Sequence, residues 1–186
     1  MQNTDAAITG ASVNLASLNA GVTGNAVVTF TPGQIVPVGG RATVVFPPTF
    51  FIQIGGTQLT NPSGISSTST IAMGSNTYTV VVTVVDTAVA SGTPITFTID
   101  GVSNPGDGTT SKYTIRTADT FGGTIESTSN IAGSAIALWP FSDAKVTLST
   151  ANAGAQQQAT VSFTTGVALR IGSHLRPFGS YDYGSC

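Results

Sequence analysis

Apolar and polar side chains alternate with a period of two residues along most of this chain. In NTYTVVVTVVD, residues 76–86, Tyr78, Val80, Val82 and Val84 fall on one face. The same alternation recurs in residues 26–31, 41–46, 94–100 and 112–116. Clusters of Gly, Pro, Asn and Ser separate these segments, which is typical of short half-buried strands between turns. Because no window combines helical apolar spacing with capping residues, the pattern predicts an all-β chain with negligible helix.

The spacing of these segments favours one architecture over another. About seven or eight short strands with turn signals between them fit an antiparallel β-sandwich. A closed barrel is the competing arrangement, and strand number alone discriminates poorly between the two. The sequence therefore predicts a sandwich over roughly the first two thirds of the chain.

A second feature is an internal repeat. The stretch ASVNLASLNAGVTGNAVVTFT begins at Ala11, and AKVTLSTANAGAQQQATVSFT begins 133 residues later at Ala144. Without a gap the two agree at Ala11/Ala144, Val13/Val146, Leu15/Leu148, Asn19/Asn152, Ala20/Ala153, Gly21/Gly154, Ala26/Ala159, Val28/Val161, Phe30/Phe163 and Thr31/Thr164. After Thr165 the agreement ends, because HLRPFG, residues 174–179, contains no alternating strand where the first copy has RATVVF. The second copy is therefore predicted to consist of two strands.

Three segments also carry a resemblance to a known family: PVGGRATVVFP, AVASGTPITFTIDGVSNP and GGTIEST. They resemble the immunoglobulin-like repeats that occur in tandem in very large extracellular proteins of microbial surfaces, including mastigoneme-like and adhesin-like chains. The resemblance covers about residues 6–130 and again 144–165. It implies an immunoglobulin-like fold and an extracellular or cell-surface location, and it implies no reaction, since its motifs consist of strand and turn residues.

The predicted organisation follows from the repeat and the resemblance together. It comprises an immunoglobulin-like β-sandwich at 6–130, a linker or edge strand at 131–143, an incomplete second repeat forming a β-hairpin at 144–165, and an irregular tail at 166–186. An isolated hairpin is marginally stable in water, so Val146, Leu148, Val161 and Phe163 need a partner for their apolar face. They could extend the sheet of the first unit, add to the sheet of another copy as strand donors, or remain unpaired in a fragment of a longer protein. Head-to-tail addition between copies would give an open filament.

The composition narrows the possible partners. Charged residues make up 8% of the chain and the net charge is −2, with only six Lys and Arg residues, so a nucleic-acid partner or a basic membrane-surface attachment is not expected. The longest apolar run, TYTVVVTVVDTAVA, is shorter than the about 20 residues that span a bilayer, so no membrane insertion is expected. The first residues lack the features of a signal peptide, which leaves either a protein that is not secreted or a mature segment behind an added Met.

Candidate catalytic and metal-binding residues are sparse, and we expect no enzyme activity and no cofactor. His174 is the only histidine, Glu126 the only glutamate and Cys186 the only cysteine, and no serine lies in a G-x-S-x-G motif. Cys186 could link two chains or be incidental. Asp100 and Asp107 flank GVSNPG and could share a Ca²⁺ ion, but both precede a glycine, and the turn interpretation is favoured.

Contact and modification candidates come from aromatic and hydroxyl residues. Trp139 and Phe141 lie between the two copies and are predicted to wedge the junction or to contact a partner, and Phe50 and Phe51 are further contact candidates. The stretch SSTST offers O-linked glycosylation at Ser66, Ser67, Thr68, Ser69 and Thr70, or simply lines an edge loop.

The sequence thus predicts a structural, non-enzymatic module of an extracellular filament or cell-surface appendage, which could polymerise by β-strand addition. Its expected partners are other copies of itself, neighbouring repeats and surface glycans. A carbohydrate-binding or adhesion module, with sugar stacking on Trp139 or Tyr113, is the main alternative. A virion surface protein is a third.

Overall fold

The computed structural model describes residues 7–106, 110–138, 142–150, 154, 156 and 158–166. These residues form antiparallel β-ladders and contain no helix, which confirms the predicted all-β class. Internal contacts divide the chain into two compact units, Met1–Leu138 and Trp139–Cys186, which are described separately below.

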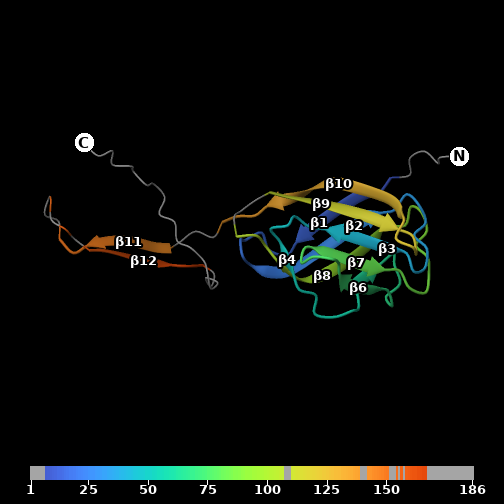
Figure 1. Ribbon diagram of the computed structural model, residues 1–186, viewed down its shortest axis with the longest axis horizontal. Coiled ribbons are helices and arrows are strands. Elements are labelled where there is room, and N and C mark those ends of the chain that lie inside the picture. The colour runs from blue at the N-terminus through green and yellow to red at the C-terminus, as the bar shows by residue number, and fades with distance from the viewer. Residues whose placement is uncertain are drawn as a thin grey trace. The chain divides into compact units, whose positions relative to one another are not determined.

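The first unit contains two five-stranded sheets, coloured blue to orange in Figure 1. Its strands are β1 (Thr9–Leu15), β2 (Thr23–Thr31), β3 (Arg41–Val45), β4 (Phe51–Ile52), β5 (Thr60–Ser63), β6 (Thr70–Met73), β7 (Thr79–Thr83), β8 (Ile95–Ser103), β9 (Thr110–Ala118) and β10 (Thr124–Ala135). One sheet has the order β1-β2-β8-β4, with β5 also pairing with β8, and the other has the order β10-β9-β3-β7-β6. Since two separate sheets enclose the core, the sandwich prediction is confirmed over the closed barrel.

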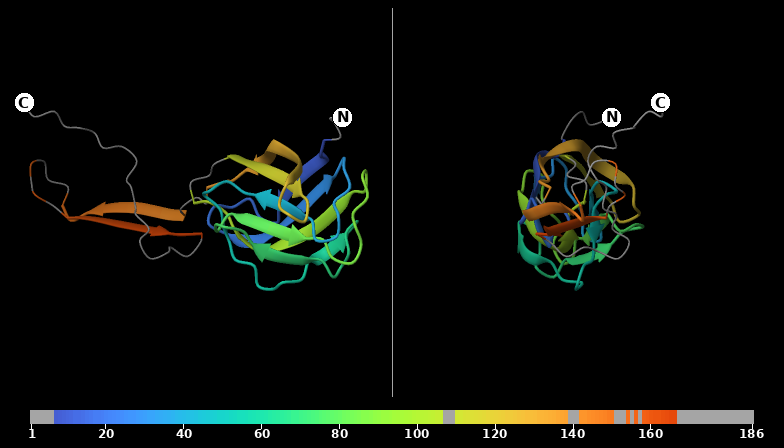
Figure 2. Two further views of the ribbon diagram at one scale, coloured as in Figure 1. Left: turned by 45° about the vertical axis from the view of Figure 1, so that its right-hand side comes forward. Right: turned by 90° about the vertical axis from the view of Figure 1, so that its left-hand side faces the viewer.

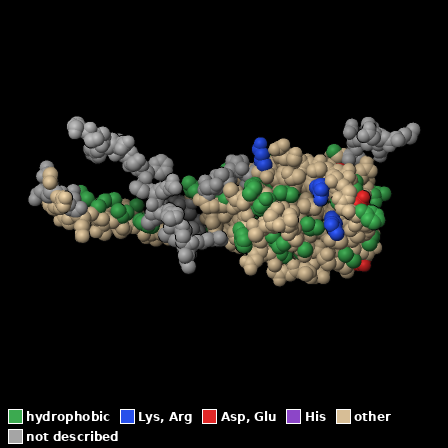
Figure 3. Space-filling model, viewed as in Figure 1, with side chains coloured by type: hydrophobic (Ala, Val, Ile, Leu, Met, Phe, Trp, Pro, Cys, Tyr) green, Lys and Arg blue, Asp and Glu red, His purple; other side chains and the backbone are tan. Residues whose placement is uncertain are grey.

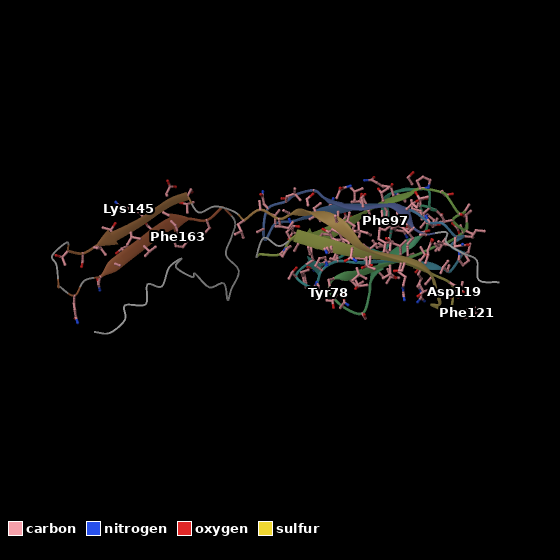
Figure 4. All side chains as sticks on the ribbon, turned by 90° about the horizontal axis from the view of Figure 1, so that it is seen from above. Tyr78, Phe97, Asp119, Phe121, Lys145 and Phe163 are labelled. Atoms are coloured by element: carbon pink, nitrogen blue, oxygen red, sulfur yellow. The ribbon has the colours of Figure 1, made fainter. Side chains whose placement is uncertain are left out.

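The core lies between the two sheets and follows the alternation seen in the sequence. Val28 and Phe97 from the first sheet and Val44, Val80 and Ile115 from the second are all 0% exposed. Figure 4 shows the Phe97 side chain inside this unit. Burial of alternating branched and aromatic side chains from both sheets is the main favourable term for such a fold.

An aromatic cluster fills one part of this core. The ring centroids of Phe46 and Tyr113 are 5.1 Å apart at an interplanar angle of 86°, and Phe50 lies 5.6 Å from Phe46 and 6.0 Å from Tyr113. These tilted, edge-on arrangements are the ones that aromatic pairs prefer. Phe46 and Phe50 flank the Pro47–Pro48 pair that ends β3, so the proline turn directs both rings inward.

One carboxylate is buried in the sandwich. Glu126 of β10 is 8% exposed, and its Oε2 accepts a hydrogen bond from the Gly33 backbone N–H at 3.1 Å. Its Oε1 accepts a bond from the Thr117 hydroxyl of β9 at 3.4 Å. Glu126 therefore ties the loop after β2 to the β9–β10 edge of the other sheet.

The second unit contributes β11 (Ser142–Leu148) and β12 (Ala159–Thr164), which form a two-stranded antiparallel sheet shown side by side in Figure 2. Residues 131–135, the start of the segment expected to be a linker or edge strand, belong to β10. The immunoglobulin-like assignment rests on the sequence resemblance alone and stays a prediction.

Candidate docking hairpin

The β11–β12 hairpin reproduces the pairing of β1 with β2 residue by residue. In the first unit Val13 pairs with Val28 and Leu15 pairs with Ala26. At the same offset of 133 residues, the second unit pairs Val146 with Val161 and Leu148 with Ala159. The backbone bond that follows the ladder is also repeated, from the Ala16 N–H to the Asn25 carbonyl at 2.8 Å and from the Ser149 N–H to the Gln158 carbonyl at 2.9 Å. The sequence repeat is thus a structural repeat.

The irregular positions of the hairpin are repeated as well. The β1–β2 ladder shifts register between Thr9 and Ser12, and the β11–β12 ladder shifts between Ser142 and Lys145. The φ angle within the first bulge is 58° at Gly10, and Asp143 at the equivalent position has a φ of 53°. A bulge fixes which residues share a face beyond it, so both hairpins present the same set of side chains on one side.

The two hairpins differ in burial. Val13 is 4% exposed and Val28 is 0% exposed, because β2 also pairs with β8 and the second sheet covers their face. Val146 and Val161, their equivalents, are 64% and 61% exposed. Leu148 is 50% exposed. Phe163 is half-buried, whereas its equivalent Phe30 is fully buried. Figure 3 shows hydrophobic side chains along the hairpin.

The backbone edge of β12 is the second unusual feature of the hairpin. In the first unit β2 lies between β1 and β8, whereas β12 has β11 as its only neighbour among the strands that the structure describes. A strand with an apolar face and an open edge is a template for pairing with another strand. Of the predicted strand-donor residues, Val146, Leu148 and Val161 are therefore exposed together on one face.

The predicted contact residues Phe50 and Phe51 have different surroundings. Phe50 is 2% exposed in the aromatic cluster, so its selection as a contact residue was wrong: it has no surface to offer a partner. Phe51 is 45% exposed in β4 and remains a candidate. Tyr113, considered for sugar stacking, is 1% exposed in the same cluster. Trp139 and Phe141 lie outside the described residues, as do His174, Asp107 and Cys186.

The hydroxyl-rich stretch at residues 66–70 is only partly accessible. Ser69 is 0% exposed and its Oγ accepts a bond from the Val85 N–H at 3.1 Å, so its selection as a glycan site was wrong for the folded chain. Ser66 and Thr68 bond to each other at 2.7 Å, and the Thr68 hydroxyl also donates to the Asp86 carboxylate. Ser67 is exposed, while Ser66 and Thr70 are half-buried. Glycosylation of the accessible hydroxyls stays a prediction.

The described residues contain no group of three or more His, Cys, Asp or Glu side chains that could hold a metal ion. Asp100 accepts a hydrogen bond from the Thr60 hydroxyl at 2.8 Å, beside a cavity of about 220 Å³ lined by the loop after β4. No helix among these residues has the length and hydropathy needed to cross a membrane. Figure 3 shows few charged side chains on the viewed face of the sandwich.

Sequence reasoning did not single out one set of exposed apolar residues. Phe121 is 97% exposed in the β9–β10 turn, visible at the end of the sandwich in Figure 4, and Ile35 and Val38 are 60% and 47% exposed in the loop after β2. A Cβ on Gly39 would lie 3.0 Å from the Thr120 side chain, so the two loops are neighbours. In the sequence, these residues are apolar side chains inside Pro/Gly-rich turns. The period-two alternation predicts the inward faces of strands, so it does not predict the exposure of turn residues.

Comparisons with known proteins give little further information. No protein-family model matches the chain, and no curated protein matches it. Its structure is similar to the crystal structure of BslA, described as a bacterial hydrophobin, with a TM-score of 0.41 and 16% sequence identity. The match covers 71% of this chain and 98% of that chain. At this level of similarity it carries no functional argument.

Proposed function

We propose that this chain is a structural, non-enzymatic module of an extracellular filament or cell-surface appendage. Its copies, or neighbouring repeats, join by β-strand addition through the β11–β12 hairpin. The single observation that carries the proposal is a hairpin with the register, the bulge and the inward residues of β1–β2, but with Val146, Leu148 and Val161 exposed. Apolar side chains that are buried in one copy of a repeat and exposed in the other are typical of an interaction element.

The exposed side chains provide a driving force for association. Full burial of a Val or Leu side chain contributes about 1.5–3 kcal/mol. Val146, Leu148 and Val161 are between 50% and 64% exposed, so covering all three contributes about 3–5 kcal/mol. Association also costs translational and rotational freedom, so this burial alone gives weak binding at most, and backbone bonds along the β12 edge would strengthen the contact.

The low charge of the surface supports the same function. With 8% charged residues and a net charge of −2, neighbouring modules repel one another weakly, so side-by-side packing carries little electrostatic cost. The uncharged polar residues of the chain are mainly Ser and Thr. A mechanical, repeating role suits such a surface better than the steering of a charged ligand.

The test measures self-association and its dependence on the apolar face. A chain carrying Cys186→Ser, which excludes disulfide-linked oligomers, is followed by sedimentation velocity and electron microscopy up to about 1 mM. We expect concentration-dependent association, weakened about tenfold or more by combining Val146→Thr with Val161→Thr. The matched control combines Thr147→Ser with Thr160→Ser, a cross-strand pair on the opposite face of the same hairpin.

Two results would contradict the proposal. A chain that stays monomeric at every concentration would show that the exposed face does not mediate self-association under these conditions. Equal weakening by the Thr147/Thr160 control would show that association depends on general hairpin integrity and not on the apolar face.

A further inference from the structure

Strand β8 is the neighbour that distinguishes the buried hairpin from the exposed one. In the first unit β2 pairs with β8 so that Val28 lies opposite Phe97, Ala26 opposite Ile99 and Phe30 opposite Ile95. All six of these residues are 0–1% exposed. Strand β8 and the core behind it therefore form a site for a hairpin with apolar residues at these positions.

The β11–β12 hairpin carries the same residue types at every position that faces this site. Ala159, Val161 and Phe163 replace Ala26, Val28 and Phe30 in the strand next to β8, and Val146 and Leu148 replace Val13 and Leu15 in the outer strand. The differences fall on the opposite face, where Lys145 stands for Ser12, Thr147 for Asn14 and Ser162 for Thr29. Within the paired strands, the side chains that would enter the core are thus identical, while most of those on the opposite face differ.

The turn of the first hairpin gives a second, independent observation. The Gly21 N–H donates to the Pro105 carbonyl at 3.2 Å, and the Asn104 side-chain amide donates to the Asn19 carbonyl at 2.9 Å, so the turn is bound to the segment that follows β8. The sequence of the second turn keeps Asn, Ala and Gly at the equivalent positions 152–154, although the residues on either side of them differ. Gly154 also keeps a positive φ, 78° against 72° at Gly21.

We infer that the site along β8 accepts the β11–β12 hairpin of a second copy in place of that copy's own β1–β2 hairpin. The inference rests on the proposed function and adds an acceptor for the hairpin. It applies to copies whose own β1–β2 is displaced, whereas intact copies associate through the apolar face and the open edge of β12. The docked hairpin places Val161 opposite Phe97 of the other copy, and Ser162 opposite Thr96, in the register that Val28 and Thr29 occupy now.

Docking along β8 depends on whether the copy's own β1–β2 hairpin already occupies the site. Among the residues that the structure describes, each chain has two hairpins of this kind, β1–β2 and β11–β12, and one site along β8. An exchange between two intact copies therefore leaves as many of these hairpins exposed as before. The chain's own β1–β2, held nearby by the connection to β8, therefore keeps the site in the intact protein. The acceptor is a copy in which β1–β2 is weakened or displaced.

The experiment traps the inferred register with a disulfide between two copies, both carrying Cys186→Ser. The acceptor carries Thr96→Cys with Val28→Asp, which places a charge at a buried position of its own first hairpin, and Val161→Asp, which disables its second hairpin. The donor carries Ser162→Cys. The Thr29 and Thr96 hydroxyl oxygens are 3.2 Å apart in the first unit, so cysteines at the equivalent positions of a docked pair come within bonding reach.

Four comparisons define the expected result. Cross-linked heterodimer on a non-reducing gel should increase about tenfold or more when Val28→Asp is introduced into the acceptor. A donor with Ser162→Cys and Val161→Asp should lose the product. A donor with Lys145→Cys in place of Ser162→Cys should also give none, because that position lies on β11, one strand further from β8. A milder acceptor with Val28→Ala, which keeps the sandwich folded, should give an intermediate yield.

The inference is overturned by an absence of heterodimer with both acceptors, or by equal yields from the Lys145→Cys donor or the Val161→Asp donor. This failure is distinguishable from failure of the proposed function. If the chain with Cys186→Ser as its only change still associates in sedimentation velocity through its apolar face while no disulfide forms, the hairpin joins copies at another edge and only the acceptor along β8 is wrong.

Discussion

Val28 and Val161 occupy equivalent positions in two copies of one hairpin, so the same substitution at each should have very different effects on stability. Each pairs with a valine across its hairpin, Val13 or Val146, in the same register. Val28 is 0% exposed and Val161 is 61% exposed. We therefore compare Val28→Ala with Val161→Ala in the otherwise unchanged chain.

The expected magnitudes follow from burial. Val28→Ala removes two methyl groups from a filled core, which costs about 1.6 kcal/mol in transfer free energy plus a cavity term, or about 2–3 kcal/mol of unfolding free energy in all. For a unit of this size the melting temperature should fall by about 6–12 °C. Val161→Ala removes methyl groups that are already largely in water, so the sandwich should keep its stability within about 0.5 kcal/mol.

The assay is urea unfolding together with calorimetry, at dilutions where sedimentation shows a monomer. Near-ultraviolet circular dichroism follows the sandwich through Tyr113, which is buried in the aromatic cluster. The reasoning is refuted if Val161→Ala lowers the unfolding free energy of the monomer as much as Val28→Ala does. That result would mean that the second hairpin is enclosed in the core of its own chain.

Three further predictions concern the first unit. Asp119→Ala should lower stability by about 1–2 kcal/mol in urea unfolding, because Asp119 Oδ1 accepts two backbone bonds, at 2.9 and 2.7 Å, that shape the β9–β10 turn; no change would show that the turn does not need them. Gly92→Ala should cost about 1–2 kcal/mol for its positive φ, and Gly64→Ala several kcal/mol more, because its Cβ would lie 1.8 Å from a carbonyl oxygen; equal melting temperatures would contradict the clash. If the chain is glycosylated, peptide mass spectrometry should find sugar at Ser67 and none at Ser69, and a modified Ser69 would refute its burial.

The alternation of apolar residues was sufficient to predict the sandwich. It identified the inward faces of the long strands, such as Val80 and Val82 in β7 and Phe97 in β8, because a period of two fixes the face once a strand exists. The internal repeat likewise located β11 and β12. Neither signal could determine that the hairpin carries the same bulge as β1–β2, because a bulge is a backbone feature and the two sequences differ there, Gly10 against Asp143.

The sequence was less informative where strands are short or composition is uniform. Phe50 and Phe51 are adjacent aromatics after a proline pair, and β4 contains only Phe51–Ile52, so no alternating run determines which ring turns inward. In the hydroxyl-rich stretch, residues 66–70, every side chain is Ser or Thr, so the sequence does not show which of them face the core. Ser69 is buried because its Oγ accepts the Val85 N–H from a residue 16 positions away. Contacts of this kind between separate segments are not encoded in a local pattern.

Asp143 provides a last test, because the second hairpin has a positive φ there, as the first hairpin has at Gly10, although the residue is not glycine. A φ of 53° suits the glycine of the first copy and costs an L-residue about 1 kcal/mol. The Thr164 hydroxyl donates to the Asp143 carboxylate at 3.5 Å, which is a weak bond, so little local energy offsets that cost. Asp143→Gly should therefore stabilise the hairpin without changing its register. It should slow amide exchange by about two- to fivefold at Thr147 and Thr160, whose N–H groups point into the β11–β12 ladder. Faster exchange at these amides would show that the side chain of Asp143 holds the bulge. Slower exchange would show that the bulge is kept against local strain, which is expected if the apolar face must match a partner built like β8.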